Sequence, residues 1–326
     1  MRKLIIVGAV LLAMMLTACC QNKKIAEPKL PQAGTEPNYN FTGSKYQQNY
    51  VWGGAMNMAW TELAQNFAKG AIELDTKDEA TLETLYKLNN PVFGKQDMDE
   101  QSYYVKSGYG QSTVQTINKE CRKKFPTKSI ADLKVELGER DIISYAYFLK
   151  EIEYMRAFNK HEVMFKERPV EGFIADAESY KNVRILDYTS DDKFLISLQL
   201  KDSKDQIFLG KGYPMDNPDE VVKLLREKAP AMKEPGTEQG APMNKKDVFM
   251  APMLHLDYNR QYHEMMGKSI LNKSLLGYGI SVMQEIIKFD MDEKGARVEN
   301  EAVIVVATSA GPGHDSYKPK QLILDK

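Results

Sequence analysis

Apolar residues recur at helical spacing soon after residue 50. Met56, Trp60, Leu63 and Phe67 fall on one side of a predicted helix, and Gly70 ends the segment. A stripe of large apolar side chains at this spacing is more often the buried face of a helix than a cofactor site. The pattern therefore predicts a core helix.

Two further segments have the same pattern. Residues 76–79 predict a capping box, followed by a helix that stops before Pro91, and residues 112–125 predict a helix between a Ser112 cap and Pro126. The predicted buried residues are Leu82, Leu85 and Tyr86 in the first of these helices and Val114, Ile117, Cys121 and Phe125 in the second. Both stripes indicate core packing.

The middle of the chain has the pattern of β-strands. Asp141–Leu149 is a nearly continuous apolar and aromatic run, typical of a strand covered on both faces, whereas residues 194–200 alternate as a half-buried strand does. A short helix opening at Pro218, a strand over 248–256 and a helical turn over 260–266 follow. Because helices come mainly first and strands mainly later, the order favours an α+β fold over a parallel α/β fold.

The last clear pattern is a long β-hairpin. Residues 286–291 alternate, Gly295 permits a tight turn, and residues 296–308 alternate again before a Gly-Pro-Gly loop. One face carries Ala296, Val298, Asn300, Ala302, Ile304, Val306 and Thr308, and the other carries Arg297, Glu299, Glu301, Val303, Val305 and Ala307. The first half predicts a strand with one face on a core. The second half predicts a strand that is either buried on both faces or exposed and prone to association.

The N-terminus has the pattern of an export signal. Arg2 and Lys3 precede an apolar stretch, residues 4–16, that is too short for a stable membrane anchor, and Leu16-Thr17-Ala18-Cys19 resembles a bacterial lipobox. This resemblance implies that the signal peptide, residues 1–18, is removed and that Cys19 carries the lipid. The alternative is an ordinary secretory signal with a chance cysteine.

Three regions follow from this interpretation. Residues 19–48 are polar and proline-containing and predict a flexible tether, and residues 49–326 predict a single folded domain. We expect an exported protein held in the cell envelope, on the outer membrane or cell surface, with the membrane as a partner through its lipid. Residue 20 is Cys and not Asp, so nothing in the signal argues for retention at the inner membrane.

Composition narrows the classes of function. The formal net charge is −1, from 44 Lys and Arg against 45 Asp and Glu, which gives no electrostatic reason to expect nucleic acid as a partner. The chain has 3 cysteines, too few for a disulfide framework once Cys19 is lipidated, and Cys121 is expected to be a buried free thiol.

The sequence contains little catalytic chemistry. The four histidines, His161, His255, His263 and His314, lack metal-ligand spacing, and neither a nucleophile elbow nor a P-loop is present. Gly108 and Gly110 precede a helix, but they favour a plain turn over an anion cradle. We therefore expect a protein that is not an enzyme and that uses no cofactor and no metal.

Three stretches resemble the serpin family. Residues 117–133 are similar to the serpin helix that carries an Ile-Asn pair, a basic segment and Ile-x-x-Leu. Residues 144–150, with Phe158 and Phe165, are similar to a central sheet strand, and residues 289–296 are similar to the hinge before the reactive loop. Leu324-Asp325-Lys326 also looks like the start of the segment that follows that loop. The resemblance covers residues 112–326.

The resemblance implies a fold, a mechanism and a set of residues. We expect N-terminal helices, a large mixed or antiparallel β-sheet and an exposed C-terminal loop. In this family a serine or cysteine protease cuts the loop, which then inserts into the sheet and traps the protease. The implied hinge is Glu293, Gly295, Ala296 and Val298, and the implied reactive loop, within residues 307–316, includes Ala307, Thr308, Ser309, Ala310 and Gly311.

The chain also departs from the family pattern. Arg297, Glu299 and Glu301 stand where inhibitors have small residues, and charged side chains slow or block insertion. The family's N-terminal motif is missing, and the chain stops where its last two strands begin, so we expect a fragment or a shortened domain. Two functions compete on this basis: a surface-tethered protease inhibitor, and a non-inhibitory lipoprotein that binds a partner or shapes the envelope.

Overall fold

The computed structural model of the chain describes residues 54–91, 94–165, 168–201, 205–213, 218–229 and 239–308. Its architecture is α+β, as the order of the predicted elements indicated. The helices are α2 (Gly54–Leu63), extended by a π-helical turn (Ala64–Ala68), α3 (Glu79–Asn89), α4 (Gly110–Lys124) and α5 (Pro218–Lys228). The predicted signal peptide, tether and lipid-attachment residue Cys19 lie outside the described residues.

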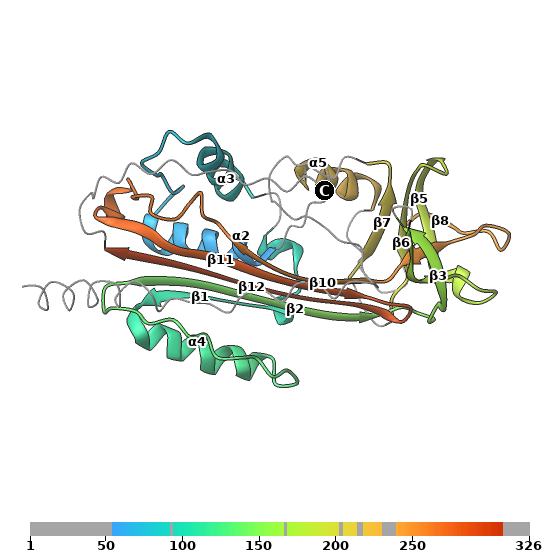
Figure 1. The fold of residues 1–326 in the computed structure, drawn as a ribbon, viewed down its shortest axis with the longest axis horizontal. Coiled ribbons are helices and arrows are strands. Elements are labelled where there is room, and N and C mark those ends of the chain that lie inside the picture. Colours follow the sequence, from blue (N-terminus) through green and yellow to red (C-terminus); the bar gives the residue numbers. More distant parts are fainter. Residues whose placement is uncertain are drawn as a thin grey trace, which may run out of the picture.

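A five-stranded antiparallel sheet forms the centre of the molecule, in the order β1-β2-β12-β11-β10. Its strands are β1 (Tyr103–Tyr109), β2 (Ile142–Glu153), β10 (Leu254–Gln261), β11 (Tyr278–Met291) and β12 (Gly295–Thr308). The three longest of these strands, β2, β12 and β11, run side by side along the length of the molecule (Figure 1). The last described strand of the chain is therefore the middle strand of the largest sheet.

Two smaller sheets lie at one end of this central sheet (Figure 1). One has the order β3-β4-β9 and the other β7-β6-β5-β8. Their strands are β3 (Asn159–Phe165), β4 (Arg168–Ile174), β9 (Met250–Pro252), β5 (Val183–Ser190), β6 (Lys193–Leu198), β7 (Ile207–Lys211) and β8 (Ala241–Pro242). Phe158, Phe173 and Phe249 pack together in the core of this end, with ring centroids 5.2–6.1 Å apart.

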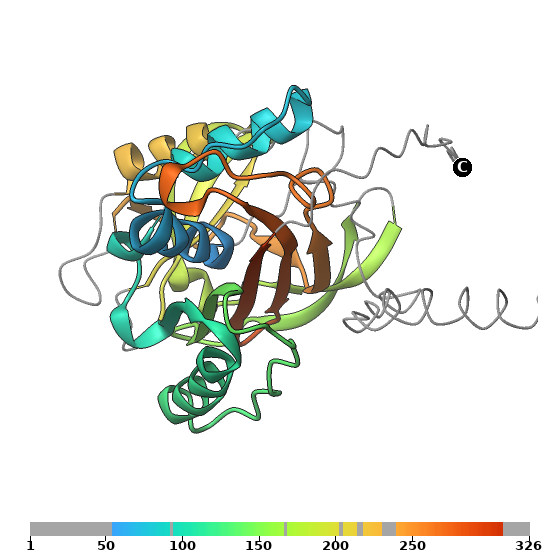
Figure 2. The same cartoon turned by 90° about the vertical axis from the view of Figure 1, so that its left-hand side faces the viewer.

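Helices cover both faces of the central sheet. α2 and α3 lie on one side and α4 on the other, as Figures 1 and 2 show. α2 is almost wholly enclosed, because Ala55, Ala59 and Leu63 are 0% exposed and Trp60 is 1% exposed. The indole of Trp60 donates to Asn89 Oδ1 at 2.9 Å, which joins α2 to the end of α3.

The predicted buried face of α3 is confirmed at Leu85 and wrong at Leu82 and Tyr86. Leu82 and Tyr86 are 45% and 67% exposed, and the buried residues are Thr81, Leu85 and Leu88. The cap is Asp78, whose carboxylate accepts from Thr81 N at 2.9 Å, and the Thr81 hydroxyl also donates to Glu264 O at 2.7 Å. This contact with a distant turn rotates the helix so that a threonine faces inward, which periodicity alone does not reveal.

The helix predicted over 112–125 is confirmed as α4. Val114, Ile117 and Cys121 are buried against the sheet, and Phe125 is buried just after the last turn. The helix starts two residues earlier than predicted, at Gly110, whose φ of +65° is a backbone conformation that glycine adopts readily. Cys121 is a buried free thiol, as expected.

Two strand predictions have different outcomes. β2 is buried on both faces over its first six residues, as its apolar run indicated. The alternation over 194–200 predicted a half-buried strand, but Leu195, Ile196, Ser197 and Leu198 of β6 are all buried. Ser197 is small enough to be enclosed beside its apolar neighbours, so its polar side chain does not mark an exposed face.

Candidate functional site

The hinge turn, residues 292–295, joins β11 to β12. The Asp292 carboxylate accepts from Lys294 N at 2.7 Å and from Gly295 N at 3.1 Å, and Asp292 N donates to Gly295 O at 3.0 Å. An aspartate that bonds its own following backbone is a common way to form a tight turn. The chain therefore reverses within three residues and β12 returns alongside β11.

Backbone contacts tie this turn to the segment after β2. Glu293 O accepts from Phe158 N, and Lys294 O accepts from Tyr154 N, each at 2.8 Å. The Glu293 side chain is largely buried, and its carboxylate lies 3.8 Å from Lys160 Nζ and 3.6 Å from Lys294 Nζ. Because both lysines are exposed, these ion pairs contribute little, and the backbone bonds hold the turn.

Residue 295 must be glycine because the backbone of β2 leaves no room for a side chain there. A Cβ atom on residue 295 would lie 2.0 Å from Ile152 O and 3.0 Å from Glu153 Cα, and both are backbone atoms. Ala296 is buried beside Met291, and Val298 is half-buried opposite Phe289 of β11. The structure thus brings the four predicted hinge residues together at one end of β12.

β12 contributes to the core on both of its faces. Ala302, Ile304 and Val306 pack on the side of α2, and Val303 and Val305 pack on the side of α4. The strand pairs with β2 from Gly295 to Val306 and with β11 from Ala296 to Thr308. Of the two alternatives for the second half of this strand, burial on both faces is confirmed.

Asn300 is enclosed on the face of β12 that carries α2. It is 1% exposed, its Oδ1 accepts from Ala55 N at 2.7 Å, and its Nδ2 donates to Glu285 Oε1 at 3.1 Å and to Ile286 O at 3.0 Å. Sequence reasoning did not find a role for this asparagine. The sequence did contain a signal for it: Asn300 is a polar residue in a row of small and apolar side chains, and a buried polar residue needs hydrogen-bond partners.

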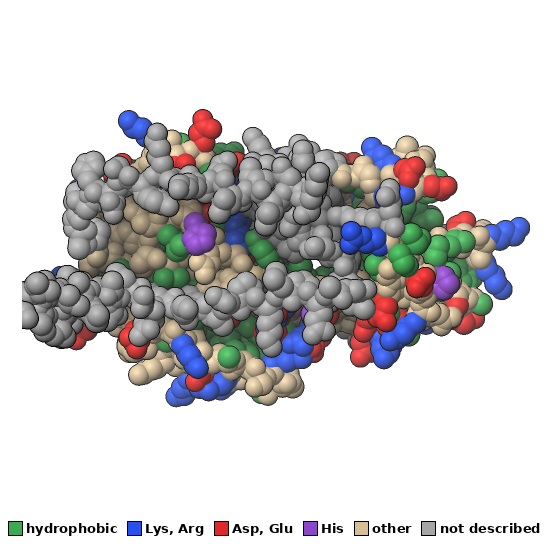
Figure 3. All heavy atoms as spheres, in the orientation of Figure 1, with side chains coloured by type: hydrophobic (Ala, Val, Ile, Leu, Met, Phe, Trp, Pro, Cys, Tyr) green, Lys and Arg blue, Asp and Glu red, His purple; other side chains and the backbone are tan. Residues whose placement is uncertain are grey.

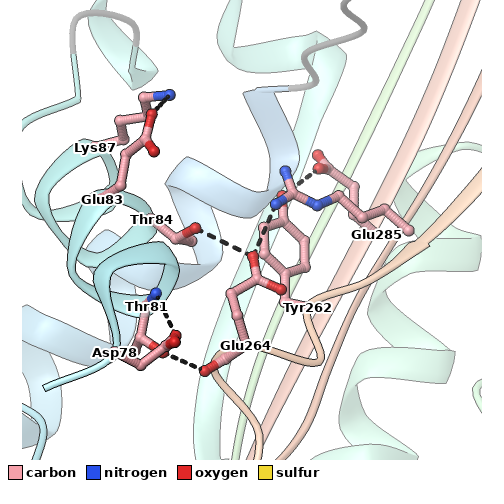
Figure 4. Close-up of polar contacts among 9 residues, drawn as sticks. Asp78, Thr81, Glu83, Thr84, Lys87, Tyr262, Glu264 and Glu285 are labelled. Carbon is pink, nitrogen blue, oxygen red and sulfur yellow. Dashed lines mark hydrogen bonds and ion pairs between the residues drawn. The ribbon is translucent and has the colours of Figure 1, made fainter. Parts of the chain in front are cut away.

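Glu285 of β11 is the centre of the same polar cluster. It is 2% exposed and accepts from Tyr262 Oη at 2.8 Å and from Met56 N at 3.3 Å, besides Asn300. Burial raises the pKa of the Glu285 carboxyl, against the lowering effect of the hydrogen bonds and of Arg260. Figure 4 shows Tyr262 facing Glu285, next to Glu264.

The charged residues on the opposite face of β12 also have partners. Tyr145 Oη donates to the Glu301 carboxylate at 2.9 Å, and burial raises the pKa of Glu301. Arg297 lies between Glu299, at 2.8 Å, and Glu151 of β2, at 3.4 Å. The charges that were expected to oppose insertion are accommodated when the strand is in the sheet.

Two of the predicted loop residues fall within β12. Ala307 and Thr308 pair with Gly279 and Tyr278 at the end of the sheet opposite the hinge. Ser309, Ala310 and Gly311 lie outside the described residues. A strand of 14 residues, at about 3.3 Å per residue, separates the hinge from Thr308 by about 45 Å.

A metal-binding cluster and a membrane-spanning helix are both absent from the described residues. None of their His, Cys, Asp and Glu side chains form a group of three that could hold a metal ion, and His255 contacts Asp290 across β10 and β11. No helix in these ranges has the length and apolar character needed to cross a membrane. On the face drawn in Figure 3, Lys and Arg side chains are interspersed with Asp and Glu.

Among known proteins, the chain matches solved structures but neither family models nor curated sequences. No family model matches the chain, and no curated protein matches it. The chain is similar to the viral serpin CrmA, with 14% identity over 77% of this chain and 92% of that one and a TM-score of 0.43. It is also similar to emu ovalbumin (10% identity, 80% and 90% covered, TM-score 0.42) and to cleaved Serpin 42Da (13% identity, 78% and 86% covered, TM-score 0.46). CrmA and Serpin 42Da carry the name of the family that the sequence motifs resemble.

Proposed function

We propose that this chain is a serpin-type protease inhibitor in which β12 is the strand that inserts after the loop is cut. One observation carries the proposal. β12 is antiparallel to both β2 and β11, so those two strands are parallel to each other, and the last described strand separates them. Two long parallel neighbours can pair directly with each other when β12 is absent, which gives the sheet a closed alternative.

Burial of the second half of β12 would favour its insertion. Five consecutive residues, 302–306, are at most 5% exposed in β12. Burying side chains of this size contributes about 1.5–3 kcal/mol for each Val or Ile, so the four of them contribute on the order of 10 kcal/mol.

The trapping step uses the protease's own chemistry. Its serine or cysteine attacks a peptide carbonyl in the loop, expels the downstream amine and holds the upstream segment as an ester or thioester. The insertion of β12 then carries that covalent bond about 45 Å along the sheet, away from the hinge. In this proposal, the position of β12 between β2 and β11 is that of the inserted strand.

The alternative is a non-inhibitory protein in which β12 never leaves the sheet. The polar contacts of Asn300, Glu301 and Arg297 favour it, because the release of β12 would leave Ala55 N without its acceptor and would remove one of the donors to Glu285. In that case the protein binds a partner or has an envelope role. Tethering through Cys19 at the outer membrane or cell surface is part of both proposals.

One experiment separates the two functions. The soluble protein from residue 21 is incubated with a panel of serine and cysteine proteases and examined on a denaturing gel and in a thermal melt. An inhibitor gives a covalent complex and a cut within residues 307–316, and its cleaved form melts at a higher temperature than the intact form. Cleavage without a complex and without a rise in melting temperature would exclude trapping by insertion and leave the binding role.

A further inference from the structure

A line of charged side chains crosses the central sheet at its hinge end. Four residues lie directly opposite one another, one on each of four neighbouring strands: Glu151 of β2, Arg297 of β12, Asp290 of β11 and His255 of β10. Residues that are directly opposite in neighbouring strands share a face of the sheet. The four side chains therefore follow one line across the strands that run side by side in Figure 1.

Contacts join the members of this line. Arg297 Nε lies 3.4 Å from Glu151 Oε1, and His255 contacts Asp290. Lys128, from the segment after α4, also contacts Glu151. We call these five residues the charge row: Lys128, Glu151, Arg297, Asp290 and His255. Their signs alternate from one strand to the next, with His255 positive only when it is protonated.

The matched order of charges continues one step further along β12. Glu299 lies directly opposite Lys288 of β11, and Arg297 Nη2 donates to Glu299 at 2.8 Å. β12 thus presents a cation and then an anion, while β11 presents Asp290 and then Lys288, an anion and then a cation. Opposite charges directly across two strands stabilise their pairing, and like charges destabilise it.

The charge row is incomplete without β12. Glu151 and Asp290 lie at the same level on the two strands that flank β12, since both are opposite Arg297. Direct pairing of β2 with β11 would bring these two carboxylates onto neighbouring strands with no cation between them, and like charges there oppose pairing. Arg297 therefore favours the inserted position in two ways, through its own ion pair and by separating the two carboxylates.

We propose that Arg297 is a positioning residue for insertion, attracted between Glu151 and Asp290 as β12 enters the sheet. The proposal deepens the proposed function and rests on it, because positioning matters for inhibition only if β12 enters after the cut. It reverses the expectation from the family pattern, in which a charged side chain at this place slows insertion. Arg297 is the third residue of β12, so it is the first charged side chain to reach its partners when pairing spreads from the hinge turn.

The contribution of Arg297 is expected to depend on salt. The side chains of Arg297 and Glu151 are 41% and 50% exposed, so solvent screens a single pair of this kind. Several charges in a network contribute more than one exposed pair, and their contribution falls as the Debye length shortens from about 10 Å at 0.1 M salt to about 3 Å at 1 M. A purely steric role of the arginine side chain has no such dependence.

The test is the rise in melting temperature when the soluble protein from residue 21 is cut within residues 307–316. In low salt we expect this rise to be smaller by about 1–4 °C in Arg297→Ala than in the wild type, and Arg297→Lys to keep most of it. In about 1 M NaCl the wild type is expected to approach Arg297→Ala. Arg168→Ala is the control, because Arg168 is an exposed arginine of β4 outside the charge row, and it is expected to leave the rise unchanged. An equal or larger rise in Arg297→Ala than in the wild type would overturn the proposal.

A variant of the partner residue tests the pairing itself. In a double-mutant cycle, Arg297→Ala is expected to reduce the rise by less in Glu151→Gln than in the wild type, because the partner is already neutral. If Arg297→Ala does not fold, Arg297→Gln removes the charge, keeps much of the side chain and takes its place in the same cycle. Equal reductions in the two backgrounds would contradict the ion pair.

The wild type separates this outcome from that of the proposed function. If cleavage of the wild-type loop gives no rise in melting temperature, the insertion mechanism fails, and the role of Arg297 fails with it. If the wild type shows the rise and Arg297→Ala shows the same rise, insertion stands and only the role of Arg297 fails.

Discussion

Replacing Gly295 by alanine adds a methyl group at the point where β12 first touches β2. The added Cβ would lie 2.0 Å from Ile152 O and 3.0 Å from the Cα of Glu153. Real Cβ atoms do not approach backbone atoms this closely, and neither neighbour is the flexible end of a side chain. The first residues of β12 must therefore shift away from β2.

The expected change in the free energy of unfolding is the difference between two opposing effects. Forcing an extra methyl group into a packed site costs about 1–3 kcal/mol. Replacing glycine by alanine stabilises by about 0.4–1 kcal/mol through the unfolded chain. The net effect on the free energy of unfolding is a loss of about 1–2 kcal/mol, which lowers the melting temperature by about 2–6 °C.

Gly70→Ala is the control for this prediction. A Cβ at Gly70 meets no atom within 4 Å, so this change is expected to be neutral or slightly stabilising. Circular dichroism melts of both variants compare the two sites directly. Equal melting temperatures for Gly295→Ala and Gly70→Ala would refute the close contact between the hinge and β2.

Three more predictions follow from burial. Burial raises the pKa of both Glu285 and Glu301 above the unfolded value, so their contribution to stability is complete at low pH and is lost as the pH rises through the folded-state pKa. Urea melts at several pH values are expected to show a smaller loss of stability in Glu301→Gln than in the wild type. A pH profile that is unchanged in this variant would contradict the prediction. Leu85→Ala is expected to lower the free energy of unfolding by about 2–5 kcal/mol and Leu82→Ala by about 0.5 kcal/mol or less, as measured by chemical denaturation. Similar losses in the two variants would mean that α3 buries the face predicted from its sequence. Burial raises the pKa of Cys121 to about 12. A variant in which Cys121 is the only cysteine is therefore expected to react with a thiol reagent at pH 8 only after unfolding. Rapid labelling of the native protein would exclude the buried position.

The elements with strong periodicity were predictable from the sequence. The stripe from Met56 to Phe67, the apolar run of β2 and the hairpin around Gly295 all appear where their patterns placed them. In each, local spacing and tertiary burial agree. α3 was different, because the Thr81 contact with Glu264, 183 residues away, turned a threonine inward and left Leu82 exposed.

The candidate site was predictable only in part. The hinge residues were predicted from their resemblance to a family motif, and they lie together at the turn before β12, while their role stays a prediction. Asn300 and Glu285 were not found, because a buried polar residue is identified by its partners, and these come from α2 and from the loop after β10.

The sequence by itself determined the class of the fold, the long final strand and the turn before it, since these depend on spacing and on local backbone preference. Only the tertiary structure decided that this strand lies between β2 and β11, because strand order depends on pairing between residues 142–164 positions apart in the chain, such as Gly295 with Glu153 and Val306 with Ile142. Likewise, only the assembled core decided that the polar and charged residues of β12 have partners, because Tyr145, Glu151 and α2 lie near them in space and far from them in sequence.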